Sequence, residues 1–394
     1  MAHVYVHVPF CVRRCSYCDF SIAVRRQIPA REYVECILAE FRAWGLGPGH
    51  QGLSTLYFGG GTPSLLPPDA LATVLTSLLD AFPSTPPLDA VEGTMPPLDA
   101  VEGTMPPLDA VEVTIEANPE DVTAEKATAW RRSGINRVSL GAQSFDDGVL
   151  RWMHRSHDAA RIGEAVHVLR HAGIANISLD LIFGLPEELG RDWGRDLDSA
   201  VSLSPSHLSL YGLTVEERTP LARWVSRGAT RPPTDDRYAD EYLLAHERVA
   251  AAGLEFYEVS NASRPGFASR HNSAYWSGRP YLGLGPAAHS FDGHARRWNL
   301  SAWEAYRRAI TEGRSPVDAE EVLTAEQRDM EQVYLALRTS VGLPVTAFTA
   351  TTALTAWKGA GWVAVSDGRV VCTPPGWLRL DALVADLTGS RATT

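Results

Sequence analysis

Residues 4–18 read VYVHVPFCVRRCSYC, an apolar run followed by three cysteines that fall within eight residues. We expect Val4–Val8 to be a strand and the CxxxCxxC spacing to lie on the loop after it. Three thiolates can hold three irons of a 4Fe–4S cubane and leave the fourth iron without a protein ligand. A zinc site is the alternative, but structural zinc takes a fourth Cys or His. The spacing therefore favours a cluster on Cys11, Cys15 and Cys18, with one iron open to a small molecule.

Short apolar runs and helical patterns alternate through the first half of the chain. The runs are rich in β-branched residues and show little alternation, which favours strands buried on both faces of a parallel sheet. Six such repeats predict an α/β fold, a partial, TIM-like (β/α)6 barrel with its helices outside. The predicted strands are Val4–Val8, Thr55–Phe58, Val111–Glu116, Arg137–Leu140, Ile177–Ile182 and Leu208–Leu213; the helices include Arg31–Trp44, Asp69–Ala81, Thr123–Arg132, Asp158–His171 and Asp192–Leu203.

Unusual residues stand at the carboxyl ends of these predicted strands, where chemistry gathers in barrels of this type. Gly59–Pro63 follows the second strand, and Glu116 ends the third. Gln143 and Asp180 lie near the ends of the fourth and fifth. A buried carboxylate is costly without a partner, so Glu116 and Asp180 favour ligand binding. Glycines let a backbone approach closely, although a tight turn is the common alternative for a Gly run.

A ten-residue unit, PPLDAVEGTM, stands identically at 86–95 and 96–105 and begins again at Pro106. Solenoid repeats are usually longer and diverge in sequence. Identical copies indicate a recent duplication of coding DNA, and their double prolines oppose helix. We expect 86–105 to be an inserted loop without a function of its own.

The bulk composition excludes some classes of protein. The 394 residues carry a net charge of −11 without runs of like charge, whereas phosphate binding needs clustered Lys and Arg, so no nucleic-acid partner is expected. No stretch reaches the roughly 18 apolar residues of a membrane span, and the N-terminus lacks a signal-peptide pattern. The chain is therefore expected to be cytoplasmic and not transmembrane. In a reducing cytosol clustered cysteines more often hold metal than form disulfides, and Cys36 and Cys372 are expected to be small buried residues.

Together these motifs resemble the radical S-adenosylmethionine (SAM) superfamily, whose hallmark is CxxxCxxC followed by a glycine-rich strand end. The chain is similar, almost from end to end, to anaerobic coproporphyrinogen III dehydrogenases and to their HemW-type haem-chaperone relatives. The resemblance implies that the open iron chelates the methionine amino and carboxylate groups of SAM, and that an electron from the cluster cleaves its sulfonium. By position, the residues expected to line SAM sites are Tyr5, Tyr17, Gly60, Gly61, Thr62, Glu116, Gln143, Arg155 and Asp180. For Arg155 a surface cation is the alternative.

Three features separate the two groups of relatives. The dehydrogenases carry a further Cys at the position of Phe20 in this chain. They also carry a long extension before the first strand, whereas Tyr5 of that strand stands almost at the start of this sequence. The chaperones typically carry HNxxYW, which matches His271–Trp276. A neutral imidazole is a common axial ligand of haem iron, so His271 is the expected haem ligand. Simple aromatic packing is the alternative for its Tyr and Trp neighbours.

The expected function is that of a haem chaperone that passes haem to haem proteins such as respiratory enzymes, membrane-bound ones among them. Its expected cofactors are a 4Fe–4S cluster, SAM and haem. An oxygen-independent coproporphyrinogen III oxidase and a radical SAM enzyme with another substrate are the alternatives, so catalysis stays open. The expected parts are a radical SAM core at 1–225, a haem- or substrate-proximal extension at 226–320, and a smaller helical, winged-helix-like domain with a β-wing at 321–394.

Overall fold

A nine-stranded sheet forms the centre of the molecule, in the order β11-β1-β4-β5-β6-β7-β8-β10-β9. The structure is a computed structural model that describes residues 2–45, 52–82, 111–348 and 351–389, so the repeat at 86–105 lies outside the described residues. The strands are β1 (His3–Val8), β4 (Thr55–Gly60), β5 (Glu112–Ala117), β6 (Arg137–Gln143), β7 (Asn176–Phe183), β8 (His207–Gly212), β9 (Glu255–Glu258), β10 (Asn261–Ser263) and β11 (Leu282–Leu284).

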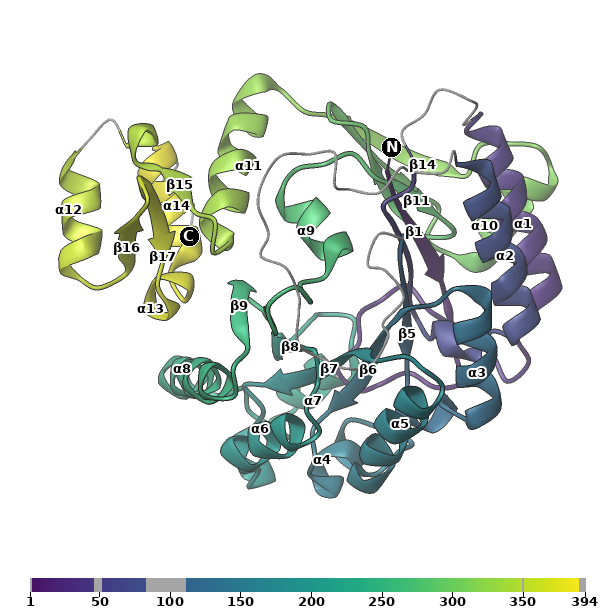
Figure 1. Cartoon of the computed structure of the whole chain (residues 1–394), viewed down its shortest axis with the longest axis horizontal. Coiled ribbons are helices and arrows are strands. Elements are labelled where there is room, and N and C mark those ends of the chain that lie inside the picture. The colour runs from purple at the N-terminus through teal and green to yellow at the C-terminus, as the bar shows by residue number, and fades with distance from the viewer. Residues whose placement is uncertain (1, 46–51, 83–110, 349–350, 390–394) are drawn as a thin grey trace.

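The six predicted strands are confirmed as β1 and β4–β8, which run parallel, each beside the next. The curved sheet ends in β11 on one side and β9 on the other, so the barrel is partial, as predicted (Figure 1). Helices cover its outer face, five of them where predicted: α1 (Ala30–Ala43), α2 (Pro68–Ala81), α3 (Ala124–Ser133), α5 (Ala159–His171) and α6 (Trp193–Ser202). The pattern did not predict α4 (Asp147–Trp152), α7 (Pro220–Ser226) or the short 3₁₀ turns at Pro63–Leu65, Pro119–Asp121 and Glu187–Leu189.

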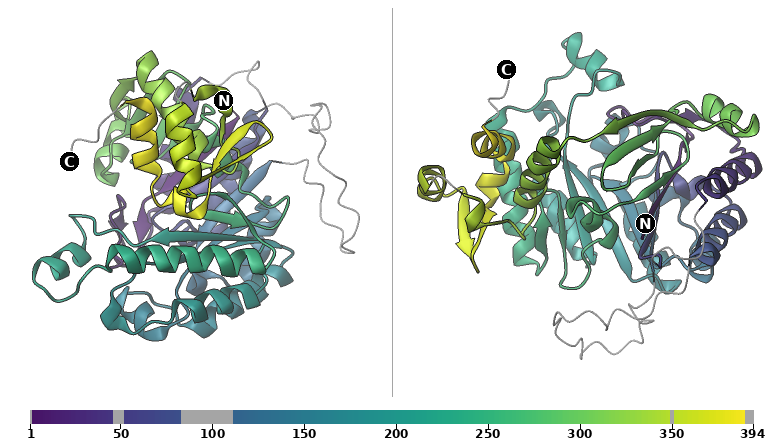
Figure 2. Two further views of the ribbon diagram at one scale, coloured as in Figure 1. Left: turned by 90° about the vertical axis from the view of Figure 1, so that its left-hand side faces the viewer. Right: turned by 90° about the horizontal axis from the view of Figure 1, so that it is seen from above.

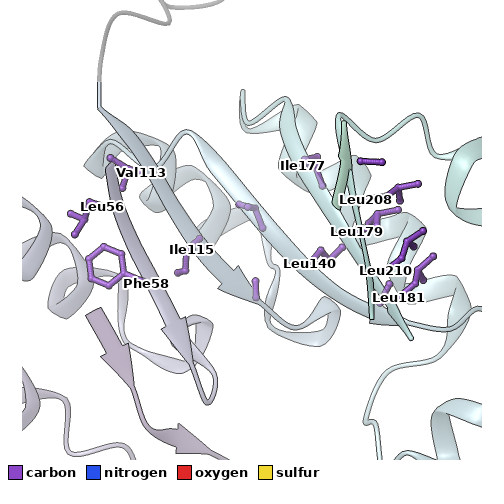
Figure 3. Packing of buried hydrophobic residues seen from close by; sticks show 14 of the residues in the cluster. Leu56, Phe58, Val113, Ile115, Leu140, Ile177, Leu179, Leu181, Leu208 and Leu210 are labelled. Atoms are coloured by element: carbon purple, nitrogen blue, oxygen red, sulfur yellow. The ribbon is translucent and has the colours of Figure 1, made fainter. Parts of the chain in front are cut away.

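Leucine, isoleucine and valine side chains fill the layer between the sheet and its helices (Figure 3). Leu56, Ile115 and Leu179 belong to this layer and are fully buried. Burying one such side chain stabilises the fold by roughly 1.5–3 kcal/mol. Successive strand residues point to opposite faces, so the residues between them, such as Glu116 and Asp180, face the inside of the barrel.

The expectation of weak alternation is therefore corrected. The strands are buried on both faces, as expected, but one face is apolar and the other polar. The inner set includes Tyr57, Thr114, Glu116, Ser139, Ser178, Asp180 and Ser209, which alternate with buried Leu, Ile and Val. The inside of the barrel therefore offers hydrogen-bonding groups to a polar ligand.

Residues 226–320 extend the same sheet at both edges. After α8 (Asp235–Ala251), β10 pairs antiparallel with β8, and β9 pairs antiparallel with β10 at the edge. At the other edge, β11 pairs in parallel with β1. The predicted boundary at 225 therefore does not separate two sheets. The segment also holds α9 (Arg270–Trp276), α10 (Trp303–Thr311) and a second sheet of β12 (His289–Phe291), β13 (Ala295–Asn299) and β14 (Val317–Val322).

A helical unit with a small sheet forms the C-terminal part and lies beside α8 and α9 (Figures 1 and 2). Its predicted hairpin is confirmed: β16 and β17 pair across Asp367 and Gly368, both in the left-handed region. No helix in the described ranges has the length and hydropathy needed to cross a bilayer. The elements are α11 (Ala325–Arg338), β15 (Leu343–Pro344), a 3₁₀ turn at Val345–Ala347, α12 (Thr351–Gly359), β16 (Val363–Ser366), β17 (Arg369–Cys372), α13 (Pro374–Trp377) and α14 (Leu380–Thr388).

Candidate functional site

The carboxyl ends of the parallel strands enclose a pocket of about 370 Å³. This volume is typical of small-molecule sites, and its place is the one at which barrels of this type do chemistry. The three clustered cysteines line it together with most of the predicted SAM-site residues. These are Tyr17, Gly60, Gly61, Thr62, Glu116, Gln143, Arg155 and Asp180.

The cysteine loop is fixed by backbone pairing at both of its ends. β2 (Phe10–Cys11) pairs in parallel with β3 (Ala23–Val24). The Arg25 N–H also donates to the Cys11 carbonyl at 2.9 Å. The loop between these strands therefore starts and ends at the mouth of the barrel, which holds its thiols over the pocket.

Burial raises the pKa of the Cys11 thiol to about 11, and it raises the pKa of the Cys18 thiol as well. Cys11 Sγ lies 3.3 Å from Thr62 Oγ1, and Arg155 Nη1 donates to Cys15 Sγ at 3.7 Å. Thiols of this kind stay protonated in the apo protein, and metal binding must displace their protons.

The donor set fits an iron–sulfur cluster. Among the described residues, no group of three or more His, Cys, Asp or Glu side chains is placed to hold a metal ion. The thiols of Cys11, Cys15 and Cys18 instead line one wall of a shared cavity. In a cubane each thiolate binds a different iron, so the ligands stand around the cluster and do not converge on one point.

The glycine-rich end of β4 brings its backbone close to β1. A Cβ atom on Gly60 would lie 2.5 Å from the His7 ring, and one on Gly61 would lie 2.9 Å from the Phe10 carbonyl oxygen. Gly60 also has φ 110°, a conformation that favours glycine. Only glycine therefore lets this strand end form the pocket wall, and the predicted role in close approach agrees with the geometry.

Two carboxylates line the pocket from the inner face of the sheet, Glu116 on β5 and Asp180 on β7, with β6 between them. Glu116 accepts hydrogen bonds from the Tyr57 hydroxyl and the Gly60 N–H, both at 2.9 Å. Burial raises the pKa of Glu116 to about 7, and it also raises the pKa of Asp180. Ser139 Oγ donates to both Asp180 oxygens at 3.0 Å. These groups retain acceptor capacity toward the hydroxyl and ammonium donors of a ligand.

Arg155 lies half-buried in the pocket wall and is not a surface cation. Its Nη2 donates to Asn118 Oδ1 at 2.6 Å and to the Gly141 carbonyl at 2.9 Å, while its buried Nε has no partner among the described residues. Gln143 adopts φ 67°, which costs a non-glycine residue about 1–3 kcal/mol and is typical of functional sites. A Cβ on Gly141 would lie 2.9 Å from Gln143 Nε2, so the glycine makes room for that amide.

Tyr5 and His271, by contrast, do not line this pocket. The Tyr5 hydroxyl lies 3.1 Å from His7 Nδ1, and the ring packs beside Tyr57 with centroids 6.0 Å apart. Tyr5 lines a second cavity behind the first. Tyr57 therefore stands between Tyr5 and the cysteine-lined pocket.

His271 is 1% exposed at the first turn of α9. Its Nδ1 lies 2.7 Å from Thr55 Oγ1 and its Nε2 lies 2.9 Å from the Tyr275 hydroxyl. Burial lowers the pKa of His271 to about 3, so the ring is neutral. Haem ligation by His271 stays a prediction, and in this structure it would require one of these hydrogen bonds to break.

The sequence interpretation missed several pocket residues, among them Asn118, Ser139 and Tyr211. Asn118 positions Arg155, and Ser139 positions Asp180. The signal that could have found them is the alternation along each strand, which puts Ser139 and Tyr211 on the same inner face as Glu116. Cys36 and Cys372 are buried in α1 and β17, away from the pocket, as expected.

Comparison with known proteins agrees with this geometry. The profile of the radical SAM superfamily matches residues 5–200. A protein of Mycobacterium tuberculosis named heme chaperone HemW is 37% identical over 98% of this chain and 94% of its own length. The chain belongs to the HemW family of the radical SAM superfamily. Further HemW relatives come from Bacillus subtilis, at 32% identity over 87% of this chain and 85% of the relative, and from Escherichia coli, at 34% over 73% and 69%.

The solved structure of coproporphyrinogen III oxidase (HemN) from Escherichia coli, described as a radical SAM enzyme, superimposes with a TM-score of 0.78. The match covers 98% of this chain and 89% of that one at 21% identity. At this identity the likeness concerns the fold alone. It confirms the predicted α/β radical SAM architecture for this HemW-family chain.

Proposed function

We propose that this chain is a haem chaperone that binds haem and passes it to haem proteins such as respiratory enzymes, membrane-bound ones among them. The observation that carries the proposal is the similarity to proteins named heme chaperone HemW, which spans most of both chains at 32–37% identity. The proposed place of action is the cytoplasm.

The proposed cofactors of the cysteine-lined pocket are a 4Fe–4S cluster and SAM. Cys11, Cys15 and Cys18 would hold three irons, since their thiols line one wall of the cavity. When bound, this pair supplies an electron and a cleavable sulfonium, the source of a 5′-deoxyadenosyl radical.

The other pocket residues would bind and orient SAM. Glu116 and Asp180 offer acceptors to its hydroxyl and ammonium groups. The close backbone approach at Gly60 and Gly61 leaves room for its methionine end. The Arg155 guanidinium, 3.7 Å from Cys15 Sγ, offsets the negative charge that a thiolate brings.

A coproporphyrinogen oxidase is the rival proposal. Phe20, which stands where the dehydrogenases have a further cysteine, is 54% exposed at the pocket and has no metal-binding atom. This residue and the HNxxYW segment favour the chaperone. A radical SAM enzyme with an unrelated substrate is the other rival.

Anaerobic reconstitution followed by two parallel assays tests the proposal. We expect added haem to give a Soret band, and haem to pass from the loaded protein to an apo haem protein. We expect no conversion of coproporphyrinogen III to protoporphyrinogen IX. Robust decarboxylation in the same sample would replace the chaperone by the enzyme, and absence of haem binding would favour an unrelated substrate.

A further inference from the structure

A second cavity, of about 500 Å³, lies behind the cysteine-lined pocket. Its walls come from several places in the fold: β1, α9 and the turn after it, the β11–β12 connection with β12, β13 and α11. In Figure 1, α9 lies between α11 and the strands around β1 and β11. Tyr5 lines this cavity, while its neighbour Tyr57 donates to Glu116 in the first pocket. The two cavities are therefore separate and stand back to back across the tyrosine layer.

The walls of the second cavity are mainly aromatic. Tyr275 and Trp276 enter from α9, and Tyr281 and Phe291 enter from the β11–β12 region. The Tyr275 and Tyr281 rings stand edge to face with centroids 4.6 Å apart. Such walls suit a flat, largely apolar ligand, because aromatic faces and edges pack on a planar ring system.

The guanidinium of Arg338 packs on the Trp276 ring and holds it in its orientation. The Arg338 guanidinium lies over its ring at 4.1 Å from the centroid, and Arg338 Nη2 pairs with the buried Glu258 at 2.7 Å. The ring therefore forms a fixed wall and does not fill the cavity.

Cations surround the same cavity. Three arginines line it, Arg279, Arg296 and Arg328, whereas Glu331 is the one carboxylate among its described lining residues. Arg296 pairs with Glu331 at 2.6 Å. Within the described ranges, Arg279 and Arg328 have no carboxylate partner. Two uncompensated guanidinium groups beside an apolar cavity suit a ligand with two carboxylates, which arginine binds with two parallel hydrogen bonds.

His289 brings a free imidazole to the same wall. Its ring stacks on Trp298 with centroids 5.7 Å apart, and no hydrogen bond to its nitrogens occurs in the described part of the chain. Burial lowers the pKa of His289, which keeps the ring neutral and its lone pair available. His271 differs, since both of its nitrogens are engaged.

The geometry points to a site for an iron porphyrin in this second cavity, with His289 as axial ligand and with Arg279 and Arg328 on its two propionates. The inference rests on the proposed function and adds where the haem is held. The first pocket has about 370 Å³, which the cluster and SAM would share, so it leaves little room for a macrocycle. The second cavity instead combines aromatic walls with cations that face no carboxylate and with the imidazole of His289.

Haem titration of the full chain, with its cluster reconstituted, tests the site. We expect His289→Ala to shift the Soret band and to weaken haem affinity by about tenfold or more. His294→Ala is the matched control, because His294 is exposed in the adjacent turn and does not line the cavity. Leu335→Trp, which places bulk in the cavity from α11, should also weaken binding. Cluster iron should stay unchanged in all three variants.

The carboxylate contacts need a separate measurement. The double variant Arg279→Ala/Arg328→Ala should bind haem more weakly but bind haem dimethyl ester as the unaltered chain does. Normal haem binding by His289→Ala and Leu335→Trp, with loss in His271→Ala, would overturn the site and leave the chaperone function standing. A chain that binds no haem at all would overturn both.

Discussion

Single residues decide the chemistry of the first pocket, and their partners explain their properties. The Glu116 carboxylate accepts two hydrogen bonds and borders the cavity. Its pKa is raised because the surrounding protein excludes solvent from the carboxyl group. Arg155 offers its positive charge to the cysteine side. The motifs predicted most of the residues that gather here, although Tyr5 lines the second cavity instead. They could not predict the serine and asparagine partners, because these residue types are common in any loop or strand.

Each clustered cysteine should be required for the cluster. We expect the reconstituted chain to hold about four irons, and Cys11→Ala, Cys15→Ala and Cys18→Ala each to lose the brown absorbance, since each thiolate binds a different iron. Iron analysis and visible spectra check this. Cys36→Ala and Cys372→Ala are controls that should keep the cluster. A full cluster in Cys15→Ala would contradict the assignment.

SAM binding should strengthen as pH rises through neutrality. The Glu116 pKa of about 7 means that the carboxyl is mostly protonated below that pH and accepts hydrogen bonds less well. A group with this pKa goes from about one-tenth to about nine-tenths ionised between about pH 6 and about pH 8, so affinity should rise by up to about tenfold. Equilibrium dialysis with labelled SAM measures it. The Glu116→Gln variant should bind SAM weakly and with little dependence on pH. If its SAM affinity depended on pH as strongly as that of the unaltered chain, the titrating group would be another residue.

At the scale of elements, the sequence predicted where strands and helices lie but not which face of a strand carries function. The six central strands and five outer helices lie where the apolar pattern predicted them, because buried apolar strands and amphipathic helices make up most of the first half of the chain. The alternation was overlooked because both faces are buried, although Ser139, Ser178 and Ser209 mark the inner face. The elements after α7 were harder to predict, since the short strands β9–β11 depend on edges that the core sheet provides.

The end of β4 should tolerate no side chain at Gly60. We expect Gly60→Ala to lose SAM binding and to destabilise the fold by about 1–3 kcal/mol, because its Cβ would meet the His7 ring in a strained conformation. Gly190→Ala is the matched control: φ is 63° there and nothing lies within 4 Å of the added atom, so SAM binding should persist. Urea denaturation and dialysis check both variants. Unchanged SAM binding in Gly60→Ala would show that the strand end adjusts.

At the scale of the whole molecule, one sheet links the parts that the sequence divides. Strands from 226–320 add to both edges of the core, and α11 of the C-terminal part lines the second cavity together with α9. The cluster side and the proposed haem side are thus built on opposite sides of one tyrosine layer. The sequence pattern could not predict this arrangement, because β11 pairs with β1 although more than half of the chain separates the two strands.

The tandem repeat should be dispensable for all of this. Its two identical copies at 86–105 stand between α2, which ends at Ala81, and β5, which begins at Glu112. The third copy runs on into β5, so deletion of residues 86–105 keeps the natural entry to the strand. Loops accept changes of length at modest entropic cost, and we expect the deletion variant to keep its thermal stability, cluster iron and haem binding. Thermal unfolding, iron analysis and haem titration of the two proteins side by side check this. Loss of expression or of cluster assembly on deletion would show that the repeat has become part of the fold, and would move it from an inserted segment to a structural one.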